Sequence, residues 1–423
     1  MHITREIKVD FGVTTNLQLY DGLLMVVGEH KAGKTALLNS IKEGNYEMHL
    51  SEDFTTYSLF LKNQTTMNKD IVRRVFSADE SQWEEELDGL VKETFSNQYY
   101  NSIKERISCI SCLVIDTDIY VLSYQRLVML SLLTKLAQKE KMIILVDEPE
   151  QFAHPLLVRE TCVLFRRLLD SGSILIMSTN SEIIVNNLFT DVEQVARLET
   201  VDNKQIIKQP NAIEIVKKVQ EFYSGSPFLR HRFSNSKQVD YGLSNVVDNY
   251  TRIYLASVLR DEIFTIMFSK YMVLGEGSSE DVLFDYIEQI FHPDWSRDLM
   301  VNYLGCLGKG TMPFYFVFLN AIGIGTICMY DYDNDTNPVH VSYAEAFSKY
   351  EKENYHLFRK FVLEPDLERV LDIEPNYKLM PIEKPVNIFH ETFITESVKD
   401  KVGEFVGLFE SMIMDMERRK KDA

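Results

Sequence analysis

The sequence has few of the features that mark secreted or membrane proteins. Its 423 residues include five cysteines, an odd number that fits no disulfide framework, and no apolar run approaches the length of a membrane span. The N-terminal residues MHITREIKVDFG lack the apolar segment of a signal peptide. We therefore expect a cytoplasmic protein in a reducing compartment, without a membrane partner.

Positive charge is also scarce. Lys and Arg number 45 against 63 Asp and Glu, which gives a formal net charge of -18. This balance argues against a protein that coats nucleic acid non-specifically, but it allows an enzyme that grips DNA locally. Short basic clusters occur at 73–74, 230–232 and 418–421, and such clusters are also typical of solvated surface.

A glycine-rich loop follows the first apolar strand. The segment GLLMVV at 22–27 predicts a buried strand and runs directly into GEHKAGKT, after which TALLNSIKEG has a helical pattern. In such a loop glycine backbone N–H groups wrap a phosphate, the lysine reaches the outer phosphates and the hydroxyl ligates magnesium. The alternative is a glycine-rich turn that only starts a helix. Four residues satisfy the pattern G-x-x-x-x-G-K-[ST]: Gly28, Gly33, Lys34 and Thr35.

A second apolar strand ends at two adjacent acids. Residues 142–146 read as a strand buried on both faces, and Asp147 and Glu148 follow directly. Carboxylates at the carboxyl edge of a parallel sheet lie where α/β proteins bind ligands, so an anionic ligand there needs a cation between. This indicates a nucleotide with magnesium. The alternative is a helix start capped by Asp147, with Pro149 in its first turn and Glu150 at its third position.

The order of these parts is recognisable. Ser123 is placed to cap a long amphipathic helix that leads to the strand at 142, and a later strand ends at Asn180. A phosphate loop, a Leu-Ser helix start, a strand ending Asp-Glu-Pro-Glu and a following His-Pro together resemble the ABC-type ATPase heads of the SMC, RecF and OLD group.

The resemblance implies roles for these residues. Asp147 would hold the magnesium shell and Glu148 would polarise the attacking water. Ser123 would contact the γ-phosphate of a nucleotide held by a second head, so that hydrolysis depends on a homodimer or higher oligomer. Two departures from the family pattern, the missing signature glycines at 124–126 and Asn180 at the switch position usually held by histidine, predict slow or conditional hydrolysis.

A second acidic constellation follows residue 270. A strand at 271–274 leads to Glu276, and Glu280 lies four residues later across a strand-to-helix turn; a later strand, GTICMY, ends at Asp331 and Asp333. Unit charges about 4 Å apart at an effective dielectric constant near 20 repel by roughly 4 kcal/mol per pair, so we expect a cation among these acids. All-oxygen ligation suits magnesium or manganese. The alternative is a flavodoxin-like domain with acidic strand ends.

This second pattern resembles a Toprim domain, the metal-dependent phosphodiester-cutting module of topoisomerases, primases and OLD nucleases. An ABC-type head followed by Toprim in one chain is the arrangement of the OLD family. The resemblance implies that one ion activates water while another stabilises the leaving oxygen, and that a lysine lies near the metals at Lys384. The implied metal ligands are Glu276, Glu280, Asp331, Asp333 and Glu368, in addition to Thr35 and Asp147 at the nucleotide.

The expected fold class is α/β with four parts. Residues 1–200 form an ABC-type P-loop ATPase domain, with an inserted and largely helical segment at about 44–108. Residues 201–267 form a helical connector or dimerisation element. Residues 268–390 form the Toprim (Rossmann-like) domain, and residues 391–423 a C-terminal helix with a basic tail.

The function expected from these parts is an ATP-binding DNA endonuclease that nicks or cuts with Mg²⁺ or Mn²⁺, gated by the nucleotide state of an ATPase dimer. Resemblance alone adds a role in bacterial defence against phage, with a defence-system partner protein. Two alternatives stay open: an ATP-dependent sensor or scaffold whose Toprim-like domain binds without cutting, and a primase or topoisomerase. Nothing in the sequence resembles a topoisomerase's tyrosine-bearing domain or a primase's zinc-binding domain.

Overall fold

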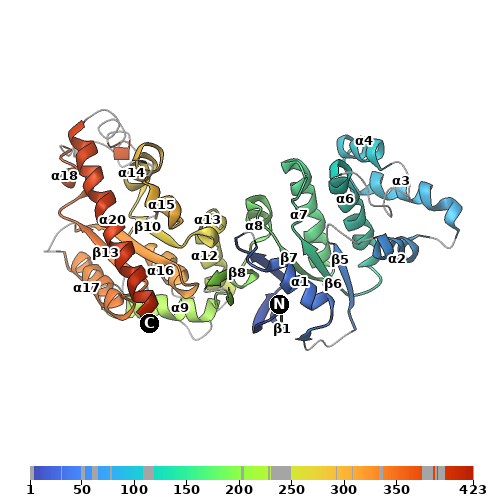
Figure 1. The fold of residues 1–423 in the computed structure, drawn as a ribbon, viewed down its shortest axis with the longest axis horizontal. Coiled ribbons are helices and arrows are strands. Elements are labelled where there is room, and N and C mark those ends of the chain that lie inside the picture. Colours follow the sequence, from blue (N-terminus) through green and yellow to red (C-terminus); the bar gives the residue numbers. More distant parts are fainter. Residues whose placement is uncertain are drawn as a thin grey trace. The chain divides into compact units, whose positions relative to one another are not determined.

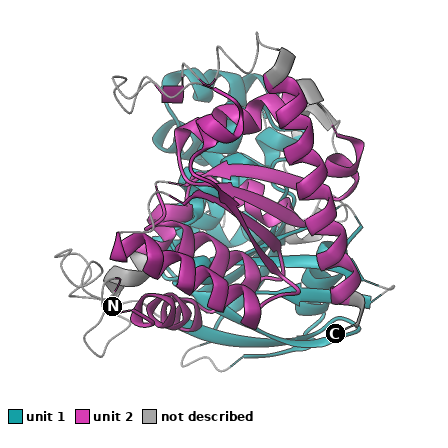
Figure 2. Cartoon of the chain, turned by 90° about the vertical axis from the view of Figure 1, so that its left-hand side faces the viewer, with its two compact units in different colours: residues 1–209 teal, residues 210–423 magenta. Residues whose placement is uncertain are grey.

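The chain folds into two compact units, Met1–Gln209 and Pro210–Ala423, coloured separately in Figure 2. The boundary falls beyond the expected residue 200 because β9 (Lys204–Lys208) pairs with β8 (Val195–Val201) and completes the first sheet. The computed structural model describes residues 4–29, 31–48, 53–59, 65–76, 79–107, 119–201, 204–226, 229, 249–291, 293–306, 308–332, 337–373, 384–385, 388 and 396–422.

Unit 1 is built on a nine-stranded sheet (Figure 1). Its order is β4-β1-β2-β3-β7-β6-β5, and β8 joins it beside β3. The strands β5, β6, β7, β3 and β8 pair in parallel, whereas β1, β2 and β4 form an antiparallel edge. The strands not yet defined are β1 (Thr4–Asp10), β2 (Thr14–Tyr20), β3 (Leu23–Val27), β4 (Tyr46–Met48), β5 (Thr55–Leu59), β6 (Met142–Asp147) and β7 (Ile174–Ser178).

Helices cover this sheet on both faces. Leu24, Leu145 and Ile176 pack in one hydrophobic cluster with α1, while alternate residues such as Ile144 and Leu175 are equally buried. The helices of unit 1 are α1 (Lys34–Lys42), α2 (Thr65–Val75), the short 3₁₀ turn η1 (Glu80–Gln82), α3 (Trp83–Thr94), α4 (Asn97–Arg106), α6 (Ile119–Leu136), α7 (Pro155–Asp170), α8 (Glu182–Leu188) and the 3₁₀ turn η2 (Val192–Gln194).

The described part of segment 44–108 consists mainly of helices α2 to α4 and also contains the short strands β4 and β5. Two local expectations for unit 1 need correction. Helix α6 begins at Ile119, with no Gly or Pro between there and Ser123 to stop it, so Ser123 is not its N-cap. The helix after β6 begins at Pro155 with His154 as its cap, which excludes a helix capped by Asp147.

Unit 2 has a four-stranded, fully parallel sheet of order β11-β10-β12-β13. Its strands are β10 (Tyr271–Gly275), β11 (Val301–Gly305), β12 (Gly325–Asp331) and β13 (Phe358–Leu363). Its helices are α9 (Ala212–Ser224), α12 (Asn249–Leu259), α13 (Ile263–Phe268), α14 (Ser278–Tyr286), the π-turn η3 (Ile287–Phe291), α15 (Asp294–Asp298), α16 (Met312–Ala321), α17 (Pro338–Glu353), α18 (Leu367–Val370) and α20 (Glu396–Asp422).

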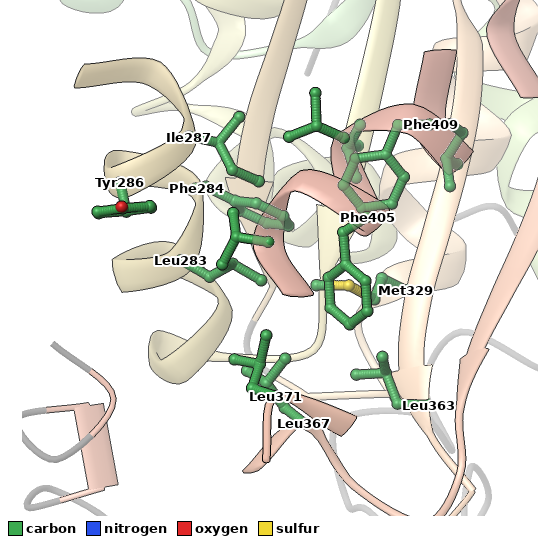
Figure 3. Packing of buried hydrophobic residues seen from close by; sticks show 14 of the residues in the cluster. Leu283, Phe284, Tyr286, Ile287, Met329, Leu363, Leu367, Leu371, Phe405 and Phe409 are labelled. Carbon is green, nitrogen blue, oxygen red and sulfur yellow. The ribbon is translucent and has the colours of Figure 1, made fainter. Parts of the chain in front are cut away.

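The long helix α20 forms part of the core of unit 2 and is not a loose tail. Phe405 and Phe409 pack with Met329 of β12 and with Leu283 and Phe284 of α14 in one buried cluster (Figure 3). The 27 residues of α20 remain helical to Asp422. This packing closes one face of the parallel sheet.

The other face is covered by aromatic side chains. Phe222 of α9 lies 5.5 Å from the ring of Phe316 in α16 and 5.3 Å from that of Phe347 in α17. The Tyr315 hydroxyl donates to the Val258 carbonyl of α12 at 3.0 Å. Helices α9 and α12 therefore pack within unit 2, and the expected connector at 201–267 is divided between the two units.

Candidate nucleotide site and candidate metal centre

The phosphate loop lies between β3 and α1. Gly28 and Gly33 adopt φ angles of 153° and 105°, which favour glycine, and a Cβ on Gly33 would lie 2.0 Å from Nε2 of Gln205. Helix α1 begins at Lys34, whose Nζ donates to the Gly28 carbonyl at 2.7 Å. The loop therefore closes on itself around the lysine, as a phosphate cradle requires.

The lysine of this loop lies beside three acids. Burial lowers the pKa of Lys34, and the carboxylates of Glu148, Asp147 and Glu150 oppose that shift by their charge. A buried ammonium is retained in proteins when it is paired. Lys34 Nζ itself donates to the carbonyls of Gly28 and Glu29, so the acids act on it through their charge and not through direct ion pairs.

The predicted magnesium ligands of the head lie together. The Thr35 hydroxyl donates to Asp147 Oδ2 at 3.0 Å. Ser178, which faces Asp147 across the β6–β7 ladder, donates its hydroxyl to Asp147 Oδ1. The two predicted ligands, from α1 and β6, therefore converge. Ser178 orients the carboxylate, a role that no local sequence pattern indicates.

Glu148 is held in a strained conformation. Its φ is 43°, in the left-handed region that a non-glycine residue seldom adopts. Its carboxylate accepts hydrogen bonds from Gln151 Nε2 and, at 3.4 Å, from Nδ2 of Asn180. The structure thus places Asn180, the predicted switch residue, beside the predicted catalytic carboxylate.

A buried arginine underlies the two acids. Arg126 is 7% exposed, and it donates from one guanidinium nitrogen to the Glu148 carbonyl at 2.9 Å and from the other to the Asp147 carbonyl at 3.4 Å. Burial lowers the pKa of Arg126, against the charge of the neighbouring acids. In the sequence Arg126 is visible only as a departure from the signature, because its contacts are tertiary.

Glu150 is a further acid of this site. Its Oε1 accepts from the Asn180 N–H at 2.6 Å and its Oε2 from the Thr179 hydroxyl at 3.0 Å. Burial raises the pKa of Glu150, which favours its neutral form. Glu150 therefore fixes the turn that carries Asn180.

Ser123 lies in the interior of unit 1. It is 5% exposed and stands within α6, three residues before Arg126. Its expected contact with a nucleotide on a second head stays a prediction.

In unit 2 the predicted acids follow the ends of β10 and β12. Glu280 is 4% exposed, and its Oε2 accepts from the Gly277 N–H at 2.8 Å. Burial, together with the charges of Asp331 and Glu276, raises the pKa of Glu280 to about 8. Gly275 makes room for it, since a Cβ there would lie 2.3 Å from the Glu280 Cβ. The three acids are thus close enough to interact electrostatically.

Two further predicted residues lie together near Asp331. The Leu367 N–H donates to Asp331 Oδ1 at 3.2 Å, which brings the start of α18 to this edge. Glu368, the next residue, lies 3.8 Å from the ammonium of Lys384. Asp333 falls outside the described residues.

The donor chemistry of unit 2 fits a hard divalent ion, because every ligand predicted there is a carboxylate. Within the part of the chain that the structure describes, however, no three His, Cys, Asp or Glu side chains are close enough to hold a metal ion. The structure therefore brings the acids into electrostatic contact without forming a finished coordination shell.

Lys309 is a residue of this site that sequence analysis missed. It belongs to the loop between β11 and α16, and its Nζ lies 3.4 Å from Glu276 Oε2. A sequence signal for Lys309 was present, since a lysine flanked by glycines in GCLGKG follows a parallel strand at its ligand-binding edge.

No described helix of the chain is long and apolar enough to cross a membrane.

Comparisons with known proteins bear on both units. Residues 267–333 match a family model described as OLD-like TOPRIM, "Overcoming lysogenization defect protein-like, TOPRIM domain". No curated protein sequence matches the chain.

Several solved structures have some similarity to the chain, at low identity. UvrA2 from Deinococcus radiodurans is 11% identical with a TM-score of 0.28, over 46% of this chain and 35% of that one. The SMC head domain from Thermotoga maritima is 12% identical with a TM-score of 0.29, over 50% and 99%. An ATP-binding cassette of an ABC transporter in its ADP conformation is 16% identical with a TM-score of 0.29, over 56% and 100%.

These low TM-scores carry no weight beside the phosphate loop and strand order described above. Residues 267–333 match the OLD-like Toprim family model, which confirms for that segment the resemblance that the sequence predicted. Unit 1 is an α/β unit with a phosphate loop between β3 and α1.

Proposed function

We propose that the protein is an ATP-binding, divalent-metal-dependent DNA endonuclease whose cutting site is regulated by nucleotide in the ATPase head. One observation carries the proposal: the segment that matches the Toprim family model holds the coupled acids Glu276, Glu280 and Asp331. A Toprim domain that retains its acids is suited to phosphodiester hydrolysis.

The metal ligands of this proposal are Glu276, Glu280, Asp331, Asp333 and Glu368. Magnesium or manganese held there would activate water and stabilise the leaving oxygen. The ammonium of Lys384, beside Glu368, would bind the non-bridging oxygens of the phosphate. The buried Glu280 would hold its carboxyl in one orientation through the Gly277 N–H.

The nucleotide site of the proposal is the cradle formed by Gly28, Gly33, Lys34 and Thr35, with Asp147. Glu148 would orient the attacking water, and Asn180 would donate a neutral hydrogen bond where related heads use histidine. A neutral donor stabilises transition-state charge less than a cation does, so turnover should be slow. Ser123 of a second head would complete the site in a homodimer.

A role in anti-phage defence, a defence partner protein and cytoplasmic location complete the proposal. They are supported only by the resemblance to the OLD family and by the absence of a described membrane-spanning helix. DNA would be held by local basic residues and by the metal, because the chain carries a net charge of -18.

The decisive experiment is plasmid DNA with Mg²⁺ or Mn²⁺, with and without ATP. Wild type should nick or cut, Glu276→Ala should not, and the exposed control Glu345→Ala should behave as wild type. The ATP lanes and the Lys34→Ala variant then show whether nucleotide activates or inhibits. Metal-dependent cleavage that survives Glu276→Ala would mean that a contaminant or another site cuts the DNA.

A sensor or scaffold is the second candidate. The departures from the ABC signature at residues 124–126 and at Asn180 favour it. In that case ATP binding persists, no DNA form is cut under any metal condition, and Glu276→Ala leaves the biological function intact.

A further inference from the structure

Lys309 is held in a defined place by its own loop. Its side chain is 8% exposed, and the Glu276 oxygen that it faces is inaccessible to solvent. The Gly308 N–H donates to the Glu276 carbonyl at 2.7 Å, and the Tyr223 hydroxyl donates to the Gly310 carbonyl on the other side of the lysine. The loop backbone, and not only a flexible side chain, therefore brings the ammonium to the acids.

Burial of this ammonium needs compensation. A lysine loses rotamer entropy and hydration when it is buried, so it is retained in such a place only beside acceptors or negative charge. Its Nζ lies 3.4 Å from Glu276 Oε2 and 5.8 Å from the centroid of the Tyr330 ring, whose face also attracts a cation. Glu276 in turn interacts with Glu280, and Glu280 with Asp331.

We propose that Lys309 is a built-in counter-ion of the Toprim acids, which stabilises the site without metal and sets its affinity for a divalent ion. This inference rests on the proposed metal-dependent function. An ammonium and a divalent ion at the same carboxylates repel each other, so a metal ion that binds Glu276 must displace or outweigh Lys309. Lys309 thereby makes metal loading weaker and reversible.

Removing the charge of Lys309 increases the affinity for a divalent ion in two ways. Without the ammonium, the carboxylates of the metal-free site repel one another unopposed, so that state is less stable. In the metal-bound state, the repulsion between the ammonium and the ion is absent, so that state is more stable. Lys309→Met should therefore bind a divalent ion more tightly than wild type, whereas loss of an ordinary structural lysine would weaken binding or leave it unchanged.

The experiment is a calorimetric titration of the full-length protein with MnCl₂, beside thermal unfolding in chelator and in rising Mn²⁺. The chain has two tryptophans, and Trp295 packs against the core cluster of unit 2, so a Trp83→Phe background makes fluorescence report on that unit. Lys309→Arg keeps the charge, and Lys349→Met removes a lysine of an exposed ion pair as a matched control.

In chelator, we expect Lys309→Met to have a lower melting temperature than wild type. We also expect it to bind Mn²⁺ at least tenfold more tightly, and its melting temperature to rise more with Mn²⁺ than that of wild type. Lys309→Arg and Lys349→Met should resemble wild type. If Lys309→Met does not fold, Lys309→Gln provides the same comparison. Equal or weaker Mn²⁺ binding by the neutral variant overturns the counter-ion role alone. Absence of Mn²⁺ binding by wild type overturns the metal centre as well.

Discussion

Glu280→Gln tests whether the acidic site of unit 2 stores electrostatic strain. The Glu280 side chain is 4% exposed, and burial with the nearby charges of Asp331 and Glu276 raises its pKa to about 8. Glutamine has nearly the same shape and never ionises. The substitution therefore removes the ionisation while it keeps an oxygen that can accept from the Gly277 N–H.

The sign of the effect follows from linkage. A carboxyl whose pKa is raised in the folded state binds more protons folded than unfolded, so stability falls as pH rises from its ordinary pKa of 4.5 to about 8. Each pH unit across that interval lowers the free energy of unfolding by about 1.4 kcal/mol, which amounts to roughly 4 to 5 kcal/mol in all. Above that interval the free energy of unfolding no longer changes through Glu280, because this carboxyl is ionised in both states.

The assay is unfolding of unit 2 in chelator between pH 4.5 and 9, followed by Trp295 fluorescence in the Trp83→Phe background. Glu280→Gln should match wild type near pH 4.5 and exceed it increasingly up to pH 8, while the exposed Glu345→Gln should track wild type throughout. In Mn²⁺ titrations, wild-type affinity should rise with pH over the same interval, because the ion displaces the Glu280 proton. Parallel stability curves for wild type and Glu280→Gln would refute the reasoning.

Two further variants test unit 1. Arg126→Met removes the charged donor to the Glu148 carbonyl, a hydrogen bond that contributes about 1.5 to 3 kcal/mol. We therefore expect ATP turnover to fall about ten- to a hundredfold while ATP affinity stays near wild type. A matching loss of ATP affinity would contradict a positioning role. Gly33→Ala should weaken binding of a fluorescent ATP analogue at least tenfold, because its φ of 105° strains any other residue within the phosphate loop and the end of the Gln205 side chain must also move. Gly44→Ala, with a φ of 83° and open space, is its control and should bind as wild type.

The parts that could be predicted from sequence are those with a local signal. The phosphate loop has fixed spacing between an apolar strand and a helix, so Lys34 and Thr35 could be placed from sequence alone. Apolar strands that end in acids likewise led to Asp147 and Asp331, because a buried parallel strand has a distinct composition. The spacing of Glu276 and Glu280 across one turn was equally readable.

The parts that could not be predicted depend on contacts between distant segments. Strand β5 has the sequence TTYSL and joins the sheet by pairing in parallel with β6. No local sequence pattern predicts this pairing. Arg126 and Ser178 contact Glu148 and Asp147 from α6 and β7, and no local sequence pattern predicts these contacts. The sequence predicts a C-terminal helix with a basic tail at 391–423, but the packing of α20 in the core of unit 2 depends on tertiary contacts.

The two acidic sites differ in the cations that the fold supplies. In unit 1, three acids interact with two buried cations, and the raised pKa of one acid favours its neutral form; these residues are Asp147, Glu148, Glu150, Lys34 and Arg126. In unit 2, the buried Lys309 lies beside Glu276. In the proposed function, the first site would therefore accept an anionic nucleotide, whereas the second would bind phosphate only after a metal ion has neutralised its acids. Because the whole chain is acidic, cleavage of DNA should depend on metal concentration more steeply than nucleotide binding does.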